Sequence, residues 1–415
     1  MRDLSEIGVA IIGTGFMGRV HVEALRRVGV SIRGVLGSSA EKSKWAAVEF
    51  GLPFGYESLD ELLTDRDVHA VHVNTPNRFH LPQAAAAIRA GKHVMCEKPL
   101  AMDRRESAEL LRLAEEHRQL VAAVNYNNRF YPLCHEAREI VRRGVAGRIF
   151  HITGSIAQDW LLYASDYNWR VLAEEGGRLR ALSDLGSHWL DLVHFITGLE
   201  VEAVLAECLT VHPIRRRPKG EVETFTNKLV TEPRVAGAGG AAEATVVGRP
   251  GLPFGPAPAA HDADPIAVTT DDFSAVLIRF AGGARGSLWL SQVSPGRKCS
   301  IRFEIAGQGR TLAWDSEHCE ELWIGRRDGP NSVLPRDPAL MHDQARAVND
   351  YPAGHAEGYP DTFKQCFRAF YCYIAAGDFA APRSFATFAD GHRDIVLCDS
   401  FVESAERGTW VKPAR

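Results

Sequence analysis

The first 125 residues alternate short apolar runs with longer stretches in which apolar residues recur every three or four positions. The short runs predict strands and the periodic stretches predict helices, because side chains repeat with period two in a strand and 3.6 in a helix. We expect strands at 8–12, 30–36, 70–73, 93–96 and 120–123, and helices at 16–28, 39–50, 59–63, 81–90 and 104–117. Each pair of successive strands is thus joined by a connection long enough to hold a helix, which is typical of βαβ units and a parallel sheet.

After residue 124 the pattern changes to longer strands that follow one another without helices between them. Successive strands of this kind favour a mainly antiparallel sheet and an α+β domain. The expected elements are a helix at 132–143, strands at 148–156, 273–280, 286–293 and 300–306, and a closing helix at 387–407. The stretch 213–272, rich in Gly, Ala and Pro, predicts a partly ordered surface excursion. The fold class is therefore α/β, with a doubly wound Rossmann domain over 1–124 and an α+β domain with an open sheet over 125–415.

Composition excludes several classes of protein. The 415 residues include 48 basic and 52 acidic side chains, for a net charge of −4, so no broad basic field is available for nucleic acid or a membrane surface. The apolar runs are far shorter than the roughly 20 residues that cross a bilayer, and no leader-like segment opens the chain. Eight scattered cysteines without a CxxC pair predict reduced thiols in a cytoplasmic protein and no metal site.

A glycine-rich turn follows the first predicted strand. Gly13, Gly15 and Gly18 form a GxGxxG pattern between that strand and the first predicted helix, which is the context in which the pattern binds dinucleotides. The three glycines suit a tight turn, the approach of a pyrophosphate and close packing of the helix on the strand. The helix N-terminus offers free N–H groups to the phosphates. A dinucleotide is the leading ligand, and a glycine-rich turn without a ligand is the alternative.

The position that reads the ribose lacks its usual carboxylate. An Asp or Glu is expected about 20 residues after the glycines, but Gly37, Ser38 and Ser39 stand there. Ser38 or Ser39 can donate to a 2′-hydroxyl or a 2′-phosphate, and Lys42 is close enough in sequence to contact a phosphate. The sequence leaves NAD and NADP open, with a slight preference for NAD.

Polar residues follow the third and fourth predicted strands, as Asn74-Thr75-Pro76 and Glu97-Lys98-Pro99. Ligands bind beyond the carboxyl ends of strands in an open α/β sheet, so both segments are expected to border the nicotinamide. The Lys98 ammonium can hold a substrate hydroxyl and stabilise a developing alkoxide. On spacing alone, a solvated lysine in a turn is the alternative.

A second polar cluster contains Asp184 and His188. On a helix that begins near Asp184, residues four apart share a face, so both side chains can point into one cleft. Histidine is the side chain best matched to proton transfer near neutral pH. A core histidine held by a hydrogen bond is the alternative.

Together these motifs resemble the Gfo/Idh/MocA family, the group of glucose-fructose oxidoreductase and inositol dehydrogenase. The resemblance covers nearly the whole chain and rests on the order and separation of Gly13 to Gly18, Glu97 to Pro99, Gly176-Gly177, Asp184-x-Gly-x-His188 and Ser384 to Gly391. It implies an N-terminal Rossmann domain, a C-terminal domain whose open, mainly antiparallel sheet often forms the oligomer interface, and a cis bond between Lys98 and Pro99.

The resemblance also implies roles for individual residues. Lys98, Asp184 and His188 would be catalytic: the histidine is base or acid on the reacting hydroxyl, the lysine polarises that hydroxyl, and the aspartate assists. Cofactor contacts are expected from Gly13, Thr14, Gly15, Phe16, Met17, Gly18, Ser38, Ser39, Asn74, Thr75, Pro76, His80, Glu97 and Lys98. Substrate contacts are expected from Lys98, Tyr126, Arg129, Trp169, Arg170, Asp184, His188 and His355. Aromatic rings can stack on a sugar while Arg and His donate to its hydroxyls.

The leading hypothesis is an NAD(P)-dependent dehydrogenase that acts on a hydroxyl of a sugar, glycoside or cyclitol. One alternative is a redox-neutral glycosidase or lyase that works through transient oxidation at C3, with Tyr126 or His355 as the extra base. A non-catalytic cofactor-binding sensor is another. A one-sided sheet needs cover, so a homodimer or homotetramer through its exposed face is expected.

Overall fold

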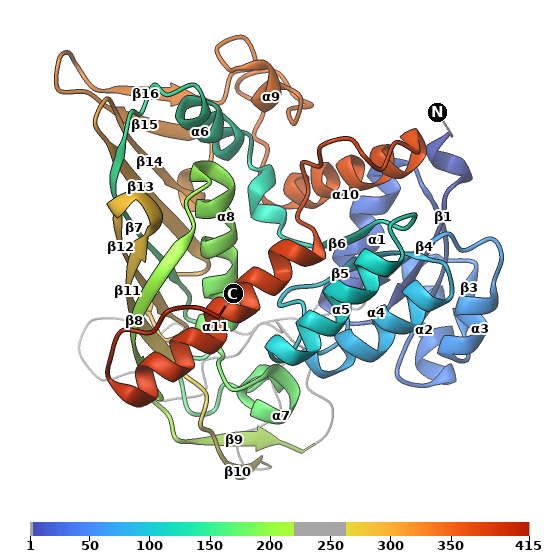
Figure 1. Cartoon of the computed structure of the whole chain (residues 1–415). Coiled ribbons are helices and arrows are strands. Elements are labelled where there is room, and N and C mark those ends of the chain that lie inside the picture. The colour runs from blue at the N-terminus through green and yellow to red at the C-terminus, as the bar shows by residue number, and fades with distance from the viewer. Residues whose placement is uncertain (1–2, 220–262, 415) are drawn as a thin grey trace, which may run out of the picture.

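The computed structural model describes residues 3–219 and 263–414. Two sheets form the two halves of the molecule in Figure 1, a parallel sheet with its helices on the right and a larger sheet on the left. Helices α10 (Tyr359–Ala376) and α11 (Phe388–Arg407) lie between the two halves. No helix in the described part of the chain has the length and apolarity to cross a bilayer.

The first sheet is a six-stranded parallel sheet in the order β3-β2-β1-β4-β5-β6. Its strands are β1 (Gly8–Ile12), β2 (Ser31–Leu36), β3 (Phe54–Tyr56), β4 (Ala70–Val73), β5 (His93–Cys96) and β6 (Ala122–Val124). The predicted parallel sheet is confirmed, with the addition of the short edge strand β3. The strand order reverses between β1 and β4, and this reversal opens the crevice where a doubly wound fold binds its ligand.

Helices cover both faces of this sheet, and local signals fix their ends. Ser39, Ser58 and Asp103 accept hydrogen bonds from the first turns of α2, α3 and α5, while Gly29 and Gly51 end α1 and α2 in the left-handed conformation. The helices are α1 (Phe16–Val28), α2 (Ala40–Phe50), α3 (Leu59–Thr64), α4 (His80–Arg89) and α5 (Arg104–Glu116). They agree with the predicted helices to within a few residues.

The second sheet has eight strands in the order β16-β15-β14-β13-β7-β12-β11-β8. The strands are β7 (Ile149–Ala157), β8 (Val201–Leu209), β11 (Phe273–Phe280), β12 (Arg285–Ser291), β13 (Ser300–Gly307), β14 (Thr311–Asp315), β15 (Glu321–Gly325) and β16 (Ser332–Pro335). Every neighbouring pair is antiparallel except β7 and β12, which are parallel. The mainly antiparallel sheet is therefore confirmed, and its one parallel pair was not predicted.

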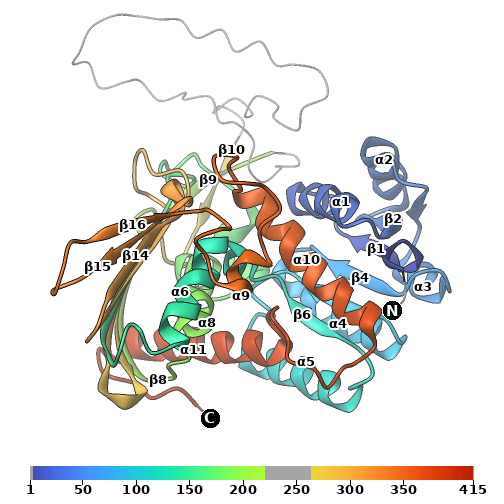
Figure 2. The same ribbon diagram turned by 90° about the horizontal axis from the view of Figure 1, so that it is seen from above.

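Helices α6 (Pro132–Arg142) and α8 (Ser187–Thr197) pack on one face of this sheet around a core that includes Trp189, Ile152 and Leu290. In the part of the chain that the structure describes, no helix covers the opposite face (Figure 2). That face exposes Leu277, Trp289 and other apolar side chains. The sheet is therefore one-sided, as the sequence predicted.

A short π-helical turn, Ala181–Gly186, leads directly into α8. The helix predicted to begin near Asp184 thus begins earlier, and its first turn is wider than an α-helix. The carboxylate of Asp271 accepts hydrogen bonds from the N–H groups of Arg180 and Leu182 at 2.5 and 2.9 Å. These bonds fix the turn that carries Asp184.

The C-terminal part of the chain returns to the first sheet. Phe363, Phe367 and Tyr371 of α10 pack in the same buried cluster as Ile11 of β1 and Leu25 of α1. Helix α11 packs on α5, and the two views in Figures 1 and 2 show it alongside that helix. The N-terminal domain is thus completed by residues that follow the second sheet in sequence.

Of the surface excursion predicted over 213–272, residues 220–262 lie outside the described residues, and the ends at 213–219 and 263–267 lie largely at the surface, whereas residues 270–272 are buried. Arg215 in β9 (Ile214–Pro218) is fully buried, as is Asp272, and Arg215 donates to the Asp272 carboxylate at 2.6 Å. Arg180 pairs with the same carboxylate. Paired charges can be buried together, so a polar, Gly-rich segment is anchored in the core. Small elements complete the fold: β10 (Ala263–Ala267), α7 (Ala173–Gly176) and α9 (Asp343–Arg346).

Candidate active site

The glycine-rich turn has the geometry that a dinucleotide requires. Gly13 has φ +119°, and a Cβ there would lie 2.7 Å from the carbonyl oxygen of Asn74. A Cβ on Gly18 would lie 2.3 Å from the carbonyl oxygen of Gly13, whereas a Cβ on Gly15 would meet no atom within 4 Å. Two glycines are thus required by the fold, and the third leaves open space above the N-terminus of α1.

Asn74 supplies independent support for a ligand in this crevice. It follows β4 beside the turn, and both its amide nitrogen and its amide oxygen are buried without a hydrogen-bond partner. Unsatisfied polar groups are costly in a folded protein unless a ligand or water meets them. The residues in the crevice therefore fit a bound dinucleotide.

At the end of β2, the missing carboxylate is explained by packing. A Cβ on Gly37 would lie 3.0 Å from the Cβ of Lys42 and 3.1 Å from the backbone nitrogen of Ser43. Ser39 uses its hydroxyl to cap α2 by accepting from the backbone N–H of Lys42. Ser38 is exposed, so of the two serines proposed to read the ribose, only Ser38 has a hydroxyl free of the helix cap.

Lys98 and Asp184, which are 86 residues apart in sequence, are in direct contact. The Lys98 ammonium donates to Oδ1 of Asp184 at 2.6 Å and to the Asp184 carbonyl oxygen at 3.0 Å. Nε of Arg170 lies 3.4 Å from the same Oδ1, and the Gln292 amide donates to Oδ2 at 3.3 Å. The Lys98–Pro99 bond is cis, in agreement with the resemblance.

The charges around this carboxylate set two protonation states. Burial opposes ionisation of Asp184, but the cations of Lys98 and Arg170 outweigh it and hold the pKa of Asp184 far below its usual value. Burial, reinforced by the charge of Lys98, lowers the pKa of His188 to about 3. At neutral pH the site therefore holds an ionised aspartate and a neutral imidazole, which can accept a proton.

His188 lies in α8, one turn beyond Asp184, and its ring meets Tyr126 edge-on with the centroids 6.1 Å apart. Its Nδ1 is buried without a hydrogen-bond partner. Trp169 lies beneath Arg170, with the guanidinium carbon 4.4 Å from the ring centroid. The structure thus brings Lys98, Arg170 and His188 close to Asp184.

Three predicted contact residues have other partners. Arg129 is buried and forms a bidentate pair with Asp191, donating from Nε at 2.7 Å. Both ring nitrogens of the buried His80 lie against backbone carbonyl oxygens, those of Pro99 at 2.8 Å and Thr75 at 2.9 Å. Partners within the fold thus hold Arg129 and the His80 ring, and their expected contacts with substrate and cofactor stay predictions. His355 is exposed on a loop, and its ring faces its own loop carbonyl at Ala353.

The structure adds residues that sequence reasoning missed, among them Gln158 and Gln292. They directly follow β7 and β12, the one parallel pair, so both lie at the same edge of the sheet. Each has a buried amide oxygen without a partner. The amide nitrogen of Gln158 contacts Sγ of Cys299 at 3.3 Å.

Tyr359, at the start of α10, also belongs to this region. Burial of its phenol raises the pKa of that group, and the negative charges of Glu97 and Asp184 raise it further. For Gln158 and Gln292, the sequence did offer a signal, because each is a polar residue directly after a strand.

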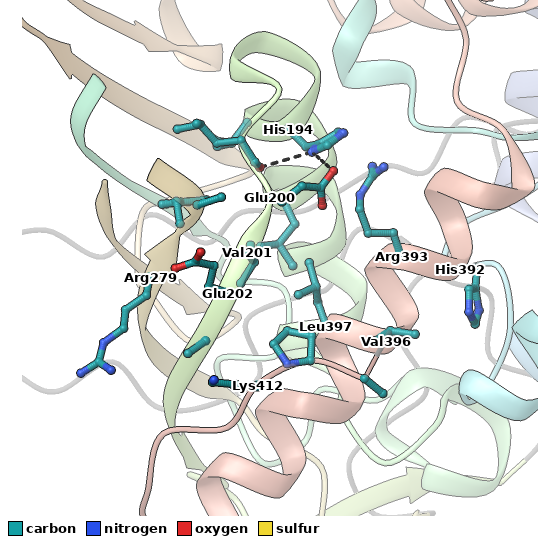
Figure 3. Close-up of a pocket in the computed structure, with 18 of the residues that line it drawn as sticks. His194, Glu200, Val201, Glu202, Arg279, His392, Arg393, Val396, Leu397 and Lys412 are labelled. Atoms are coloured by element: carbon teal, nitrogen blue, oxygen red, sulfur yellow. Dashed lines mark hydrogen bonds and ion pairs between the residues drawn. The ribbon is translucent and has the colours of Figure 1, made fainter. Parts of the chain in front are cut away.

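A separate cavity of about 750 Å³ lies between α8, β8 and α11. Figure 3 shows its lining, with His194 and Glu200 turned toward each other and Arg393 projecting from α11. Neither Lys98 nor Asp184 lines this cavity. It is therefore distinct from the site around Lys98 and Asp184.

Comparisons with known proteins agree with this geometry. Residues 7–126 match the model of the oxidoreductase family with an NAD-binding Rossmann fold, and residues 134–313 match the GFO/IDH/MocA C-terminal domain. Levoglucosan dehydrogenase from Pseudarthrobacter phenanthrenivorans is 30% identical over 427 residues, which cover 98% of each chain. The predicted dinucleotide-binding domain is thereby confirmed as an NAD-binding Rossmann domain.

Solved structures match over nearly the full length. A levoglucosan dehydrogenase in complex with NADH and levoglucosan has a TM-score of 0.81 at 26% identity, covering 98% of this chain and 99% of that chain. An inositol dehydrogenase homolog with NADH and myo-inositol from Azotobacter vinelandii has a TM-score of 0.79 at 22% identity, covering 98% of both chains. The second likeness is one of fold.

Proposed function

The chain belongs to the Gfo/Idh/MocA family of NAD-binding oxidoreductases, and from this premise we propose that it oxidises a ring hydroxyl of a sugar, glycoside or cyclitol. The observation that supports the proposal most directly is the contact between the Lys98 ammonium and the Asp184 carboxylate, with the neutral imidazole of His188 beside it. Levoglucosan, which the similar dehydrogenase is named for, is the first substrate to test.

In the proposed reaction, His188 is the general base. Its neutral imidazole takes the hydroxyl proton while Lys98 donates to the same oxygen and stabilises the developing alkoxide. Asp184 acts through Lys98, because its two oxygen contacts fix the ammonium. When bound, NAD⁺ accepts the hydride from the carbon that carries the hydroxyl, which leaves a ketone.

We assign substrate positioning to the residues that surround the carboxylate. Trp169 presents an aromatic ring held by Arg170, and such rings stack on the apolar faces of sugars. Gln158 and Gln292 each have an amide oxygen that needs a donor, and a sugar hydroxyl is such a donor. These side chains support a polyhydroxylated substrate.

The test is to incubate the purified protein and NAD⁺ together with levoglucosan, L-sorbose, myo-inositol or a simple glycoside, one polyol in each reaction. Reduced nicotinamide is followed by absorbance and the products by mass. Reduced cofactor together with a product two mass units lighter supports the dehydrogenase. Aglycone release or elimination without net reduced cofactor would replace it with the redox-neutral glycosidase or lyase. Cofactor binding without turnover of any polyol would contradict both.

We also propose that the exposed face of the eight-stranded sheet forms the interface of a homodimer or homotetramer. Leu277, Trp289 and Trp323 are 49, 43 and 36% exposed on this face, and contiguous apolar surface of this kind usually marks an interface. Light scattering on the native protein and on Trp289→Glu tests the proposal. A monomeric native protein, or a variant with unchanged mass, would contradict it.

A further inference from the structure

A buried chain of hydrogen bonds joins α10 to the residue before Lys98. The Tyr371 hydroxyl lies 2.7 Å from Nε2 of His72, and Nδ1 of His72 lies 2.7 Å from Nδ1 of His21. Nε2 of His21 then lies 2.9 Å from Oε1 of Glu97, which also accepts from the Asn125 amide at 2.6 Å. The three rings are fully buried, and Glu97 is 6% exposed.

The donors in this chain can all point the same way. Glu97 accepts as a carboxylate, so Nε2 of His21 carries a proton and its Nδ1 is the acceptor in a neutral ring. Nδ1 of His72 is then the donor, and its Nε2 accepts from the Tyr371 hydroxyl. Every contact is satisfied in this arrangement without charging either histidine. The chain therefore ends with a donor aimed at Glu97.

The surroundings hold the two imidazoles in place. The ring of Phe367 lies 4.7 Å from the centroids of both His21 and His72, and the Tyr371 ring stacks on His72 at 5.9 Å. Burial lowers the pKa of His72 well below its usual value. For Glu97, burial opposes ionisation, but the hydrogen bond from His21 leads the effects that lower its pKa.

Glu97 is close enough to the reaction centre for its charge to matter there. It directly follows β5 and precedes Lys98, at the carboxyl edge of the sheet, beside the crevice that fits the dinucleotide. Its charge is one of the influences on the pKa of His188 and of Tyr359. A carboxylate at this place attracts the positive nicotinamide ring of NAD⁺ and gains nothing from the neutral ring of NADH.

We propose that the Tyr371–His72–His21 chain is a positioning device that holds Glu97 as a carboxylate and thereby favours NAD⁺ over NADH in this site. The inference rests on the proposed function and names a regulation of that same site. It makes Tyr371, a residue of the C-terminal part of the chain, a determinant of cofactor redox preference without contact with the cofactor.

The experiment measures the dissociation constants of NAD⁺ and NADH by calorimetry, and that of NADH also by its fluorescence, in the native protein, three variants and a control variant. Tyr371→Phe removes only the first donor and should raise the ratio Kd(NAD⁺)/Kd(NADH) about threefold, the size of one modest hydrogen bond. Glu97→Gln should raise the ratio about tenfold or more, because it removes the charge. In the double variant, Tyr371→Phe should add nothing to Glu97→Gln.

Tyr373→Phe is the matched control, since it removes a hydroxyl from the same helix that bonds to the Ala381 carbonyl instead of to His72. Its ratio should equal that of the native protein. An unchanged ratio in Tyr371→Phe, or an equal effect in both Glu97 backgrounds, would overturn the inference while leaving the dehydrogenase intact. Native protein that binds neither nucleotide would overturn the proposed function itself.

A second measurement leaves Tyr371 and Glu97, the two ends of the hydrogen-bond chain, unchanged. Nitrogen-15 NMR of labelled histidines in the native protein, assigned with His21→Gln and His72→Gln, reports which ring nitrogen carries the proton. The inference expects Nε2–H for His21 and Nδ1–H for His72. An Nε2–H form of His72 would reverse the donor direction and overturn the inference.

Discussion

The ammonium of Lys98 is held twice by one residue, at 2.6 Å from Oδ1 of Asp184 and at 3.0 Å from the Asp184 carbonyl oxygen. An ammonium has three donors, so two are used within the protein and one remains for a ligand. Because the π-helical turn carries both acceptor oxygens, the position of Lys98 depends on the start of α8. The third N–H of the ammonium therefore has a fixed orientation relative to His188.

Removing this ammonium should slow the chemistry far more than it weakens cofactor binding. We expect Lys98→Met to lower kcat about a hundredfold to a thousandfold, the typical effect of losing one donor to a developing oxyanion, with the NADH dissociation constant within about threefold of native. Lys44→Met, at a surface lysine paired with Glu57, is the control and should behave as the native protein. Steady-state kinetics and NADH fluorescence measure the two effects; full turnover in Lys98→Met would contradict the assignment.

The pH dependence of oxidation should report on the Lys98 charge. The pKa of His188 is about 3 in the native site, lowered by burial and then by Lys98. A base with so low a pKa stays neutral, so kcat/KM should not lose activity through His188 as the pH falls from 7 to 5. In Lys98→Met one of the lowering influences is gone, so the acid limb should move to higher pH. A limb at the same pH in both proteins would contradict this prediction.

Gln292 should act on binding more than on chemistry. Its amide oxygen is buried without a partner beside Asp184, so we expect it to accept from a substrate hydroxyl. Gln292→Ala should raise KM about tenfold, in line with the loss of a buried hydrogen bond, with a smaller change in kcat. The exposed Gln308→Ala serves as the control. A fall in kcat at constant KM would place Gln292 in the chemistry instead.

Much of the fold follows from local patterns. The first helix begins at Phe16 and ends at Val28 as predicted, because a glycine turn precedes it and Gly29 follows it. Helix α10 was not predicted, since Lys364 and Gln365 are buried within it and interrupt the apolar repeat. Burial of these polar residues depends on tertiary contacts, such as the ion pair between Lys364 and Asp350.

The sequence predicted the site residues that belong to recognisable motifs. It did not predict those that are brought together only by strand pairing. Lys98 and Asp184 were singled out separately, and the fold brings them into contact. Gln158 and Gln292 were missed because periodicity does not reveal that β7 and β12 are parallel. The ion pair of Arg129 with Asp191 of α8 was not predicted, because the two residues are distant in sequence.

The stability of the fold should depend on pH through His135, which lies between Phe130 and Phe195 with ring centroids at 5.5 and 5.0 Å. Burial, followed by the charges of Arg138 and Arg129, lowers its pKa to about 3. The pKa of His135 in the folded protein is below its unfolded value of about 6.5. As the pH falls below 6.5, His135 therefore binds a proton in the unfolded chain but not in the native protein. Native stability should therefore decrease by about 2 kcal/mol between pH 7 and pH 5 from this residue alone.

The variant His135→Phe tests this directly, because Nε2 of His135 has no hydrogen-bond partner to lose. We expect the free energy of unfolding of His135→Phe, measured by urea denaturation at both pH values, to fall by about 2 kcal/mol less than that of the native protein over this interval. The exposed His318→Gln should retain the native pH dependence. An identical decrease in native protein and His135→Phe would mean that the His135 ring is already protonated in the folded state at pH 5, which its apolar surroundings oppose.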